Sequence, residues 1–408
     1  MICNGEENFY DDFHDVGDDG MKLKSFEIAG FRKFDRLELP DLSQLNLFVG
    51  INDVGKTSLL EAVMGFSCGL NTAPLQFLIF QHRLDDGDDA NSLDALANRQ
   101  AEAIFSCFHQ GRQDEMFSFR LTGNVEGEDR YTVSYEFLPS AKAGEVLSYE
   151  LPEQRLAPLV QPVFQQVQGR NVMVPYLGNF QITILPEHGR EIGKQEMMLF
   201  ALPAYNQGMG GRHLIPAYFN DILGHRSERE NHQIYAKLSR SGKLLDFCTE
   251  MNRSFPELGI QEIANPSYPD GSQAPVYFRL RSGELRPIYA FGDGVRRWFT
   301  ILGNMALARD GIQCIEEADA TFHHDAQRAL ARNLYDAMHT YGTQLFLTTH
   351  SEEFLQMLLN EMKRRDTAFL RDGVRVITLR DIGGTVRQRT LSGDEAWRAL
   401  ADGLELRR

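Results

Sequence analysis

The 408-residue sequence is short of positive charge, and this shortage narrows the classes of ligand to consider. Its formal net charge is −15, whereas a protein that coats duplex DNA is usually basic overall or carries a dense basic stripe. The basic residues are dispersed, and the small cluster Lys363-Arg364-Arg365 is typical of a solvated helix face. DNA stays open as a direct ligand, but the composition does not support it.

The sequence also lacks long apolar runs and paired cysteines. No apolar run approaches the roughly 20 residues that span a bilayer, so we expect no membrane association. The N-terminus is acidic, which excludes a signal peptide or a transit peptide. The five cysteines show no Cys-x-x-Cys spacing, which argues against a zinc site or a disulfide framework. We therefore expect a cytoplasmic protein with reduced thiols.

The segment from Gly50 to Thr57 carries the most specific pattern in the chain. It reads Gly-Ile-Asn-Asp-Val-Gly-Lys-Thr, follows the apolar run Leu45–Val49 and precedes a stretch with helical spacing. A strand, a glycine-bounded loop and a helix in this order form a phosphate-binding P-loop. The glycines let backbone N–H groups turn toward a phosphate, and the helix N-terminus adds positive charge. We expect Lys56 to bridge the β- and γ-phosphates of a nucleotide and Thr57 to hold Mg²⁺.

Two later apolar strands end in residues that suit hydrolysis. The strand Gly311–Ile315 is followed by Glu316 and Glu317, the arrangement of a Walker B strand. The first carboxylate would contact the Mg²⁺ shell, and the second would polarise the attacking water. The strand Gln344–Thr348 leads to His350. Because ligand sites of open α/β sheets lie at the carboxyl edge of the strands, we expect His350 to reach the γ-phosphate.

A glycine-flanked turn, Gly292-Asp293-Gly294, opens a helix predicted over Val295–Ala308. Exposed N–H groups at a helix start form an anion site. Taken singly, this turn, the acidic strand end and the histidine each have an ordinary structural explanation. Their order and spacing after a good P-loop favour a shared functional role.

Hydrophobic patterns divide the chain into four segments. Residues 1–20 contain seven acidic residues and no Lys or Arg, which predicts a disordered extension. Residues 21–205 contain the P-loop and an alternating pattern, which predicts an antiparallel sheet running to about Leu185. Residues 206–275 predict a helical insertion. Residues 276–408 alternate strand and helix, the pattern of a parallel sheet flanked by helices.

These patterns predict an α/β fold. Its main part is a P-loop NTPase with a mainly parallel sheet, to which an antiparallel β extension and a helical insertion are added. The last stretch, Asp394 to Arg408, is predicted to be one helix. No heptad repeat is sustained, so no long coiled-coil arm is expected.

Together these elements resemble ABC-type ATPases of the SMC/RecF and OLD-like group. Within this resemblance, the chain looks more like compact bacterial "AAA family" ATPases of phage-defence systems such as PARIS and Septu. The resemblance covers most of residues 21–408 and is only general over about 100–275. The matching elements are Phe31-Arg32-Lys33-Phe34, the P-loop, Gly292-Asp293-Gly294, Ile315-Glu316-Glu317 and Thr348-Thr349-His350-Ser351.

The resemblance implies a role for each matching residue. Glu317 would be the catalytic base, His350 the switch histidine, and Glu316 with Thr57 the Mg²⁺ contacts. The residues that would bind ATP within one subunit are Gly50, Asn52, Asp53, Gly55, Lys56, Thr57 and Ser58. The signature residues that would contact ATP bound to a second subunit are Gly292, Asp293 and Gly294.

The resemblance also concerns positions outside these motifs. Asp319 and His323 would line the dimer seam, and the pair His323-His324 is more typical of a diverging helix start than of a metal site. Arg32 would approach the nucleotide or lie on the surface, and the sequence does not choose between these two. No residue matches the Q-loop glutamine well, although Gln76 and Gln81 are candidates.

The chain departs from the family pattern at three points. Glu316 replaces the usual Walker B aspartate and is one methylene longer, which affects the Mg²⁺ geometry and the turnover expected. The signature lacks its usual serine. OLD proteins carry a C-terminal Toprim nuclease domain, and no such domain is visible before Arg408.

We therefore expect an ATPase that dimerises, or forms a higher homo-oligomer, around ATP and Mg²⁺. It would regulate a separately encoded effector in anti-phage defence, and we expect this effector to be a nuclease. One alternative is a RecF/SMC-like ATPase that binds DNA in repair or recombination, and a weaker one is a non-hydrolysing scaffold gated by ATP. Strongly salt-dependent DNA binding would favour the repair alternative.

Overall fold

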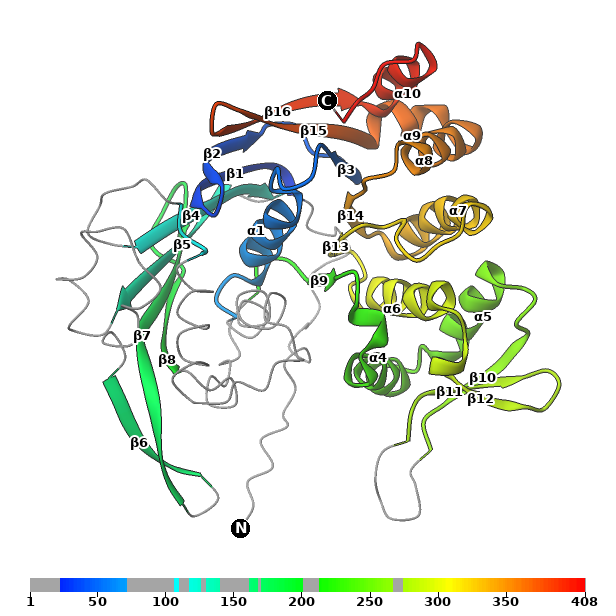
Figure 1. Ribbon diagram of the computed structural model, residues 1–408, viewed down its shortest axis with the longest axis horizontal. Coiled ribbons are helices and arrows are strands. Elements are labelled where there is room, and N and C mark those ends of the chain that lie inside the picture. The colour runs from blue at the N-terminus through cyan, green and yellow to red at the C-terminus, as the bar shows by residue number, and fades with distance from the viewer. Residues whose placement is uncertain are drawn as a thin grey trace.

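The computed structural model describes residues 23–71, 106–109, 117–125, 130–139, 161–167, 170–200, 213–266 and 274–407. Two large β-sheets lie side by side with one helix between them (Figure 1). The acidic extension at 1–20 and the two Q-loop candidates, Gln76 and Gln81, fall outside the described residues. Within those residues, no helix has both the length and the apolar character needed to cross a membrane.

The first sheet is antiparallel and has seven strands in the order β2-β1-β4-β5-β7-β6, with β8 paired to β7. This confirms the predicted antiparallel extension, which continues beyond Leu185 to the end of β8. The strands are β1 (Leu23–Phe31), β2 (Phe34–Leu39), β4 (Phe117–Val125), β5 (Arg130–Pro139), β6 (Gln161–Val167), β7 (Arg170–Pro186) and β8 (Gly193–Phe200).

The second sheet has the order β16-β15-β3-β14-β13-β9 and is parallel except for β16. Every residue of β3 and β14 is buried, as expected for strands covered on both faces. The P-loop strand β3 is therefore central, between two strands from the last third of the chain. The strands are β3 (Leu45–Val49), β9 (Ala217–Asn220), β13 (Ile312–Ile315), β14 (Gln344–Thr348), β15 (Val374–Ile382) and β16 (Thr385–Ser392).

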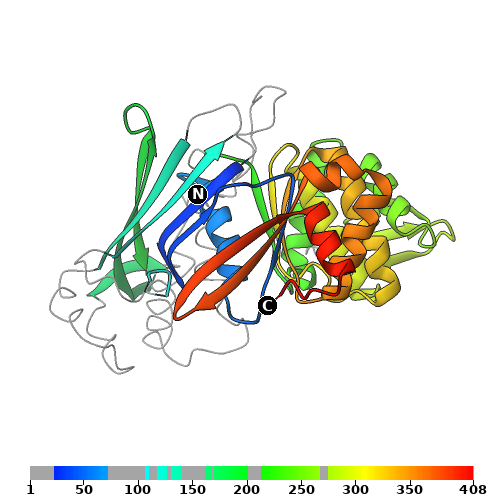
Figure 2. The same ribbon diagram turned by 90° about the horizontal axis from the view of Figure 1, so that it is seen from above.

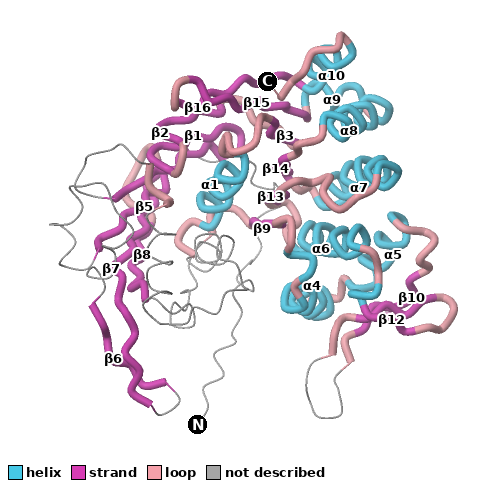
Figure 3. The backbone as a smooth tube through the Cα atoms, in the orientation of Figure 1, coloured by secondary structure: helices cyan, strands magenta, loops and turns pink. Residues whose placement is uncertain are grey.

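Helices cover both faces of the parallel sheet (Figures 1 and 3). Helix α1 (Lys56–Cys68) lies between the two sheets, and all its residues except Thr57 are buried. Tyr135 from β5 donates a hydrogen bond to the Gly65 carbonyl of α1 at 2.7 Å. The helices of the last third gather on the opposite face (Figure 2, yellow to red). They are α6 (Asp293–Leu307), α7 (His324–Tyr341), α8 (Glu352–Arg365), α9 (Thr367–Asp372) and α10 (Gly393–Ala401).

Alternate residues of β3 belong to two separate cores. Phe48 packs in the core shared with α1 and the antiparallel sheet. Leu45, Leu47 and Val49 pack in the core shared with the helices of the last third. A slip of one residue would exchange these two sets, so the packing fixes the register of the strand that leads into the P-loop.

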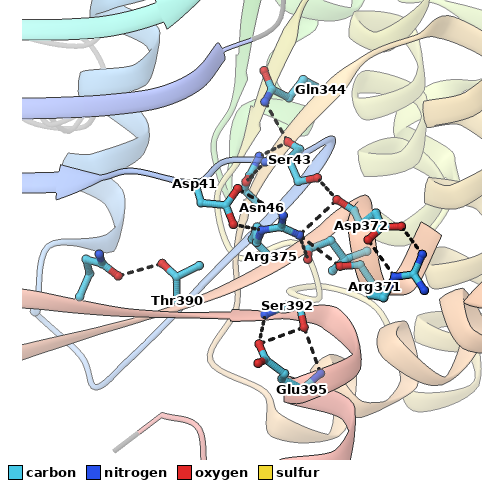
Figure 4. Close-up of polar contacts among 12 residues, drawn as sticks. Asp41, Ser43, Asn46, Gln344, Arg371, Asp372, Arg375, Thr390, Ser392 and Glu395 are labelled. Atoms are coloured by element: carbon cyan, nitrogen blue, oxygen red, sulfur yellow. Dashed lines mark hydrogen bonds and ion pairs between the residues drawn. The ribbon is translucent and has the colours of Figure 1, made fainter. Parts of the chain in front are cut away.

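A polar network fixes the same register at the amino end of β3 (Figure 4). The Asn46 amide donates to the Ser43 carbonyl at 2.6 Å, and the Gln344 amide donates to the same carbonyl at 2.8 Å. The Ser43 hydroxyl donates to the Asp372 carbonyl at 2.6 Å. The segment that leads into β3 is therefore bonded to Gln344, the first residue of β14, and to the segment before β15, at the end of β3 away from the P-loop.

Residues 206–275 were predicted to be a helical insertion; their described part, 213–266 and 274–275, contains two α-helices but also strands. The four-residue strand β9 is the edge of the parallel sheet. Its shortness gave the sequence pattern no clear strand signal. After β9 come the 3-10 turn η4 (Gly224–Arg226) and the helices α4 (Glu228–Arg240) and α5 (Leu244–Ser254). A small three-stranded sheet follows, formed by β10 (Ile260–Ala264), β11 (Tyr277–Leu280) and β12 (Leu285–Pro287). The 3-10 turn η5 (Ile288–Ala290) comes next.

The single helix predicted from Asp394 to Arg408 is shorter than expected. Helix α10 begins after Ser392, which forms a capping box with Glu395, and it ends at Ala401. Gly403 has a φ of 77°, the left-handed conformation that reverses the chain after a helix. Residues 402–407, the C-terminal tail, therefore run back over the domain.

Candidate active site

The loop from Gly50 to Gly55 has the backbone shape that its glycines allow. Gly50 has a φ of 150°, and a Cβ atom there would lie 2.6 Å from the Leu379 carbonyl oxygen of β15. Gly55 has a φ of 103°, and a Cβ atom there would lie 2.9 Å from the Phe34 ring. Both positions therefore exclude a side chain by conformation and by space.

The Lys56 side chain folds back over this loop. Its Nζ donates to the Gly50 carbonyl at 2.9 Å and to the Ile51 carbonyl at 2.8 Å, and the residue is 6% exposed. Burial lowers the pKa of Lys56 to about 8, and the negative charge of Glu317 opposes that shift. The ammonium group is thus held inside the loop, where a phosphate would be cradled.

The other predicted P-loop residues differ in environment. Asn52 and Asp53 are exposed, whereas Ser58 is buried at the start of α1. Asp53 adopts a φ of 62° and forms an ion pair with Lys33 at 2.6 Å. Lys33 also donates to the Asp53 backbone carbonyl at 2.5 Å, so it contacts the outside of the loop.

Arg32 takes neither position considered from the sequence. Its Nε lies 2.7 Å from Glu61 Oε2 in α1, and both side chains are buried. A second guanidinium nitrogen donates to the Ser106 hydroxyl at 3.3 Å. Arg32 therefore fixes α1, while the neighbouring Lys33 contacts the loop from outside.

Thr57 and Glu316 meet as the sequence predicts. The Thr57 hydroxyl donates a hydrogen bond to Glu316 Oε1, which brings the P-loop helix and the residue after β13 together. A hydroxyl and a carboxylate are oxygen ligands of the kind that Mg²⁺ prefers. The described residues contain no group of three His, Cys, Asp or Glu that would hold a metal alone. The pair therefore fits a Mg²⁺ ion that takes its other ligands from phosphate and water.

Glu317 and His350 form the second pair of the site. Glu317 Oε1 lies 3.2 Å from His350 Nε2. Glu317 has a φ of 41°, and its backbone N–H donates to the Thr348 hydroxyl at 2.8 Å. Burial lowers the pKa of His350, Lys56 lowers it further, and Glu317 opposes the shift. A carboxylate in a strained backbone position beside a neutral imidazole suits a general base.

Arg297 was not singled out from the sequence, yet it holds the loop that carries both glutamates. It is 1% exposed, and its Nη2 donates to the carbonyls of Glu316 at 2.5 Å and Glu317 at 2.8 Å. Its Nη1 donates to the Ala320 carbonyl at 3.3 Å. The sequence signal was an arginine directly before the apolar run Trp298-Phe299 in a helix, because a charge on a buried face needs a fixed partner.

The loop after Glu317 is bonded to the loop that carries His350. The Thr349 hydroxyl donates to Asp319 Oδ1 at 2.5 Å, and the Ala318 N–H donates to the Thr348 carbonyl at 2.9 Å. His323 is the N-cap residue of α7. The structure therefore brings Asp319 beside the catalytic candidates and places His323 at the start of the next helix.

The Gly292-Asp293-Gly294 turn lies apart from these residues. Asp293 accepts hydrogen bonds from Arg226 at 2.8 Å and from Arg296 at 3.1 Å, and Arg226 belongs to the turn after β9. These contacts, led by Arg226, lower the pKa of Asp293. Strands β9 and β3 are three strand spacings apart, which is about 14 Å. The turn is at the same edge of the sheet as the P-loop but on the other side of β13 and β14.

Two protein-family models match parts of the chain. Residues 21–134 match a family described as "AAA ATPase domain". Residues 216–356 match a family described as "AAA domain, putative AbiEii toxin, Type IV TA system". The first match contains the P-loop, and the second contains the glutamate pair and the histidine.

Two curated proteins are similar to the chain. An "ATP/GTP phosphatase" of Helicobacter pylori is 20% identical over 367 residues, which cover 85% of this chain and 90% of that protein. The "DNA replication and repair protein RecF" of Lactococcus lactis subsp. lactis is 46% identical over 43 residues, which cover 10% of this chain and 12% of that protein.

Solved SMC head domains give weak structural matches. The head domain from Thermotoga maritima has a TM-score of 0.39 at 9% identity and covers 91% of this chain and 99% of that one. An SMC head bound to the C-winged helix domain of ScpA has a TM-score of 0.44 at 11% identity and covers 92% and 99%. Both TM-scores are below 0.5, so the strand order and the P-loop carry the fold assignment. The chain therefore has an α/β P-loop NTPase fold, and two of its segments are similar to AAA ATPase domains.

Proposed function

We propose that the protein hydrolyses ATP at a site completed by a second copy of the same chain. The observation that carries this proposal is the convergence of Lys56, the Thr57–Glu316 pair and the Glu317–His350 pair at the carboxyl edge of one parallel sheet. That edge is where open α/β sheets bind ligands.

In this proposal the P-loop binds the triphosphate and Lys56 neutralises its β- and γ-phosphates. Thr57 and Glu316 would hold a Mg²⁺ ion, which would supply positive charge to the phosphate oxygens. Glu317 accepts a proton from the attacking water as the bond from water oxygen to γ-phosphorus forms. The bond from γ-phosphorus to the bridging oxygen breaks, and the electron pair leaves with ADP. His350 orients Glu317 through the 3.2 Å contact.

The separation of the Gly292-Asp293-Gly294 turn from the P-loop supports a shared site. The turn contacts the segment after β9, and β9 lies about 14 Å across the sheet from β3, so we infer that the turn does not touch a nucleotide on the P-loop of its own chain. A Cβ atom at Gly292 would have no heavy atom within 4 Å, so its helix start is open to an anion. Two copies related by a two-fold axis would each present this turn to the nucleotide of the other.

The proposal extends to the partner on which the ATPase acts. The resemblance to phage-defence ATPases and the match to a family described as a putative toxin favour control of a separately encoded effector such as a nuclease. The short match to RecF favours a second candidate, an ATPase that contacts DNA directly. Salt-dependent binding of duplex DNA by the purified protein would select the second candidate.

ATP turnover and native mass test the site. We expect Glu317→Gln to bind ATP but to hydrolyse it about 10²- to 10⁴-fold more slowly, because the water loses its base. Native mass should show Glu317→Gln as a dimer with ATP and as a monomer without it. Glu353→Gln is the matched control, since Glu353 is an exposed carboxylate near the start of α8.

Equal turnover by the two variants would remove Glu317 from its proposed role. A monomer with ATP bound would contradict the shared site but leave the P-loop assignment intact. Lys56→Ala should lose ATP binding, and retained binding would refute the nucleotide site itself.

A further inference from the structure

We propose that Arg407 is a positioning residue for His350, so that the C-terminal tail sets the geometry of the catalytic pair. This inference rests on the proposed ATPase function and adds a residue that lies outside all the motifs of the sequence.

The tail is fixed to the strand beside the P-loop strand. After the reversal at Gly403, the Leu404 N–H donates to the Ala399 carbonyl of α10 at 2.9 Å. Leu406 is buried, and its carbonyl accepts a hydrogen bond from the Thr378 hydroxyl of β15 at 2.8 Å. Thr378 is paired with Val49, the residue before the P-loop. The tail therefore reaches the carboxyl edge of the sheet in a defined position.

Arg407 extends from this fixed point to the histidine loop. Its Nη1 donates to the His350 carbonyl at 2.8 Å. Its Nη2 lies 3.1 Å from Glu405 and 3.5 Å from Glu352, so two carboxylates hold the guanidinium in place. A charged donor to a carbonyl forms one of the stronger hydrogen bonds available.

The peptide that links His350 to Ser351 is bonded at both of its polar groups. Its N–H, that of Ser351, donates to the Thr349 hydroxyl at 3.0 Å, and its carbonyl, that of His350, accepts from Arg407. Thr349 is bonded to Asp319, and Ser351 caps α8 by accepting from the Phe354 N–H at 3.0 Å. The Thr349 bond is local to the histidine loop, so the Arg407 bond is the one that ties this peptide to the C-terminal tail. A shift of this peptide would move the Cα atom of His350, and with it the imidazole whose Nε2 lies 3.2 Å from Glu317 Oε1.

The charge of Arg407 also affects His350, through the pKa of the imidazole. The charged groups that face His350 are Lys56, Glu317, Asp319 and Arg407. Arg407 and Lys56 lower the pKa of His350, whereas Glu317 and Asp319 raise it. Loss of Arg407 should therefore favour the protonated imidazole and also loosen its position.

Kinetics and side-chain titration of Arg407→Gln test the inference. We expect kcat for ATP to fall about ten-fold, with KM changed less than two-fold, because orientation is lost while nucleotide contacts remain. The pKa of His350, followed by NMR of the imidazole in the nucleotide-free protein, should rise. Arg407→Lys keeps the charge and should restore the pKa but only part of kcat.

Arg398→Gln is the matched control, since Arg398 is an exposed arginine of α10 paired only with Asp394 in the described contacts. If Arg407→Gln behaves like Arg398→Gln in both kcat and the His350 pKa, the inference is overturned. A rise in KM with unchanged kcat would also overturn it. If the wild-type protein does not hydrolyse ATP, the proposed function fails, and the His350 pKa alone still decides whether Arg407 acts on His350.

Discussion

The ammonium group of Lys56 makes the affinity for ATP depend on pH in a calculable way. In the nucleotide-free site its pKa is about 8, because burial disfavours the charged form. Bound phosphates favour the charged form, so the pKa of Lys56 rises on binding. Below pH 8 the group is already protonated and affinity should not change. Above pH 8 binding must take up a proton, and affinity falls as pH rises.

The size of this effect follows from one titrating group. Between pH 7 and pH 9 the protonated fraction of a group with this pKa falls from about 0.9 to about 0.1, so Kd rises about ten-fold. The second pKa of a phosphate is about 6, which leaves this window free of phosphate titration. The fall in binding free energy is about 1.4 kcal/mol per pH unit once pH exceeds the pKa.

Calorimetric titration with a non-hydrolysable ATP analogue measures both the affinity and the proton uptake. Buffers with different ionisation enthalpies should report about one proton taken up at pH 9 and almost none at pH 7. Lys56→Arg is the control, because arginine stays charged throughout this range. A Kd that stays constant from pH 7 to pH 9, or an equal slope in Lys56→Arg, would refute the reasoning.

Three further changes test other parts of the site. Gly50→Ala should lower the free energy of unfolding by about 1–3 kcal/mol and weaken ATP binding, because the methyl group would overlap a β15 carbonyl. The control is Gly283→Ala, at a positive φ with open space, which should lower the temperature of thermal unfolding less. Equal effects of the two changes would count against the overlap. Arg32→Met should destabilise the protein by about 3–5 kcal/mol in urea unfolding, because Glu61 would be left buried without its cation, and an unchanged midpoint would contradict that. Glu316→Asp should raise ATP turnover if the extra methylene limits Mg²⁺ geometry, and unchanged turnover would remove the scaffold alternative.

Features encoded by consecutive residues could be predicted from the sequence. The P-loop requires glycines, a lysine and a threonine at fixed spacing between a strand and a helix, and β3 and α1 lie as expected. The antiparallel sheet could be predicted because alternation of apolar and polar residues continues over many positions. The meeting of Thr57 with Glu316 followed from the rule that parallel strands share a carboxyl edge.

Features that depend on contacts between distant segments could not be predicted. Strand β9 has four residues, too few for a periodic pattern, and only its pairing with β13 makes it part of the sheet. The contacts of Arg297 with Glu317 and of Arg407 with His350 join residues 20 and 57 positions apart. The apolar run after Arg297 indicates a buried charge but does not identify its partner, and nothing in the local sequence distinguishes Arg407 from arginines that form ordinary surface ion pairs.

The central place of β3 has a consequence for how the protein is made. Asn46 of β3 bonds to Leu345 of β14 across 299 residues, and β15 is made later still. At about 5–20 residues per second, a ribosome needs about 15–60 s to synthesise that interval. During this time the P-loop strand has no partner on either side and cannot adopt its final place. The nucleotide site is therefore one of the last parts of the molecule to form, and a nascent chain cannot engage ATP until nearly all of the described sequence has been translated.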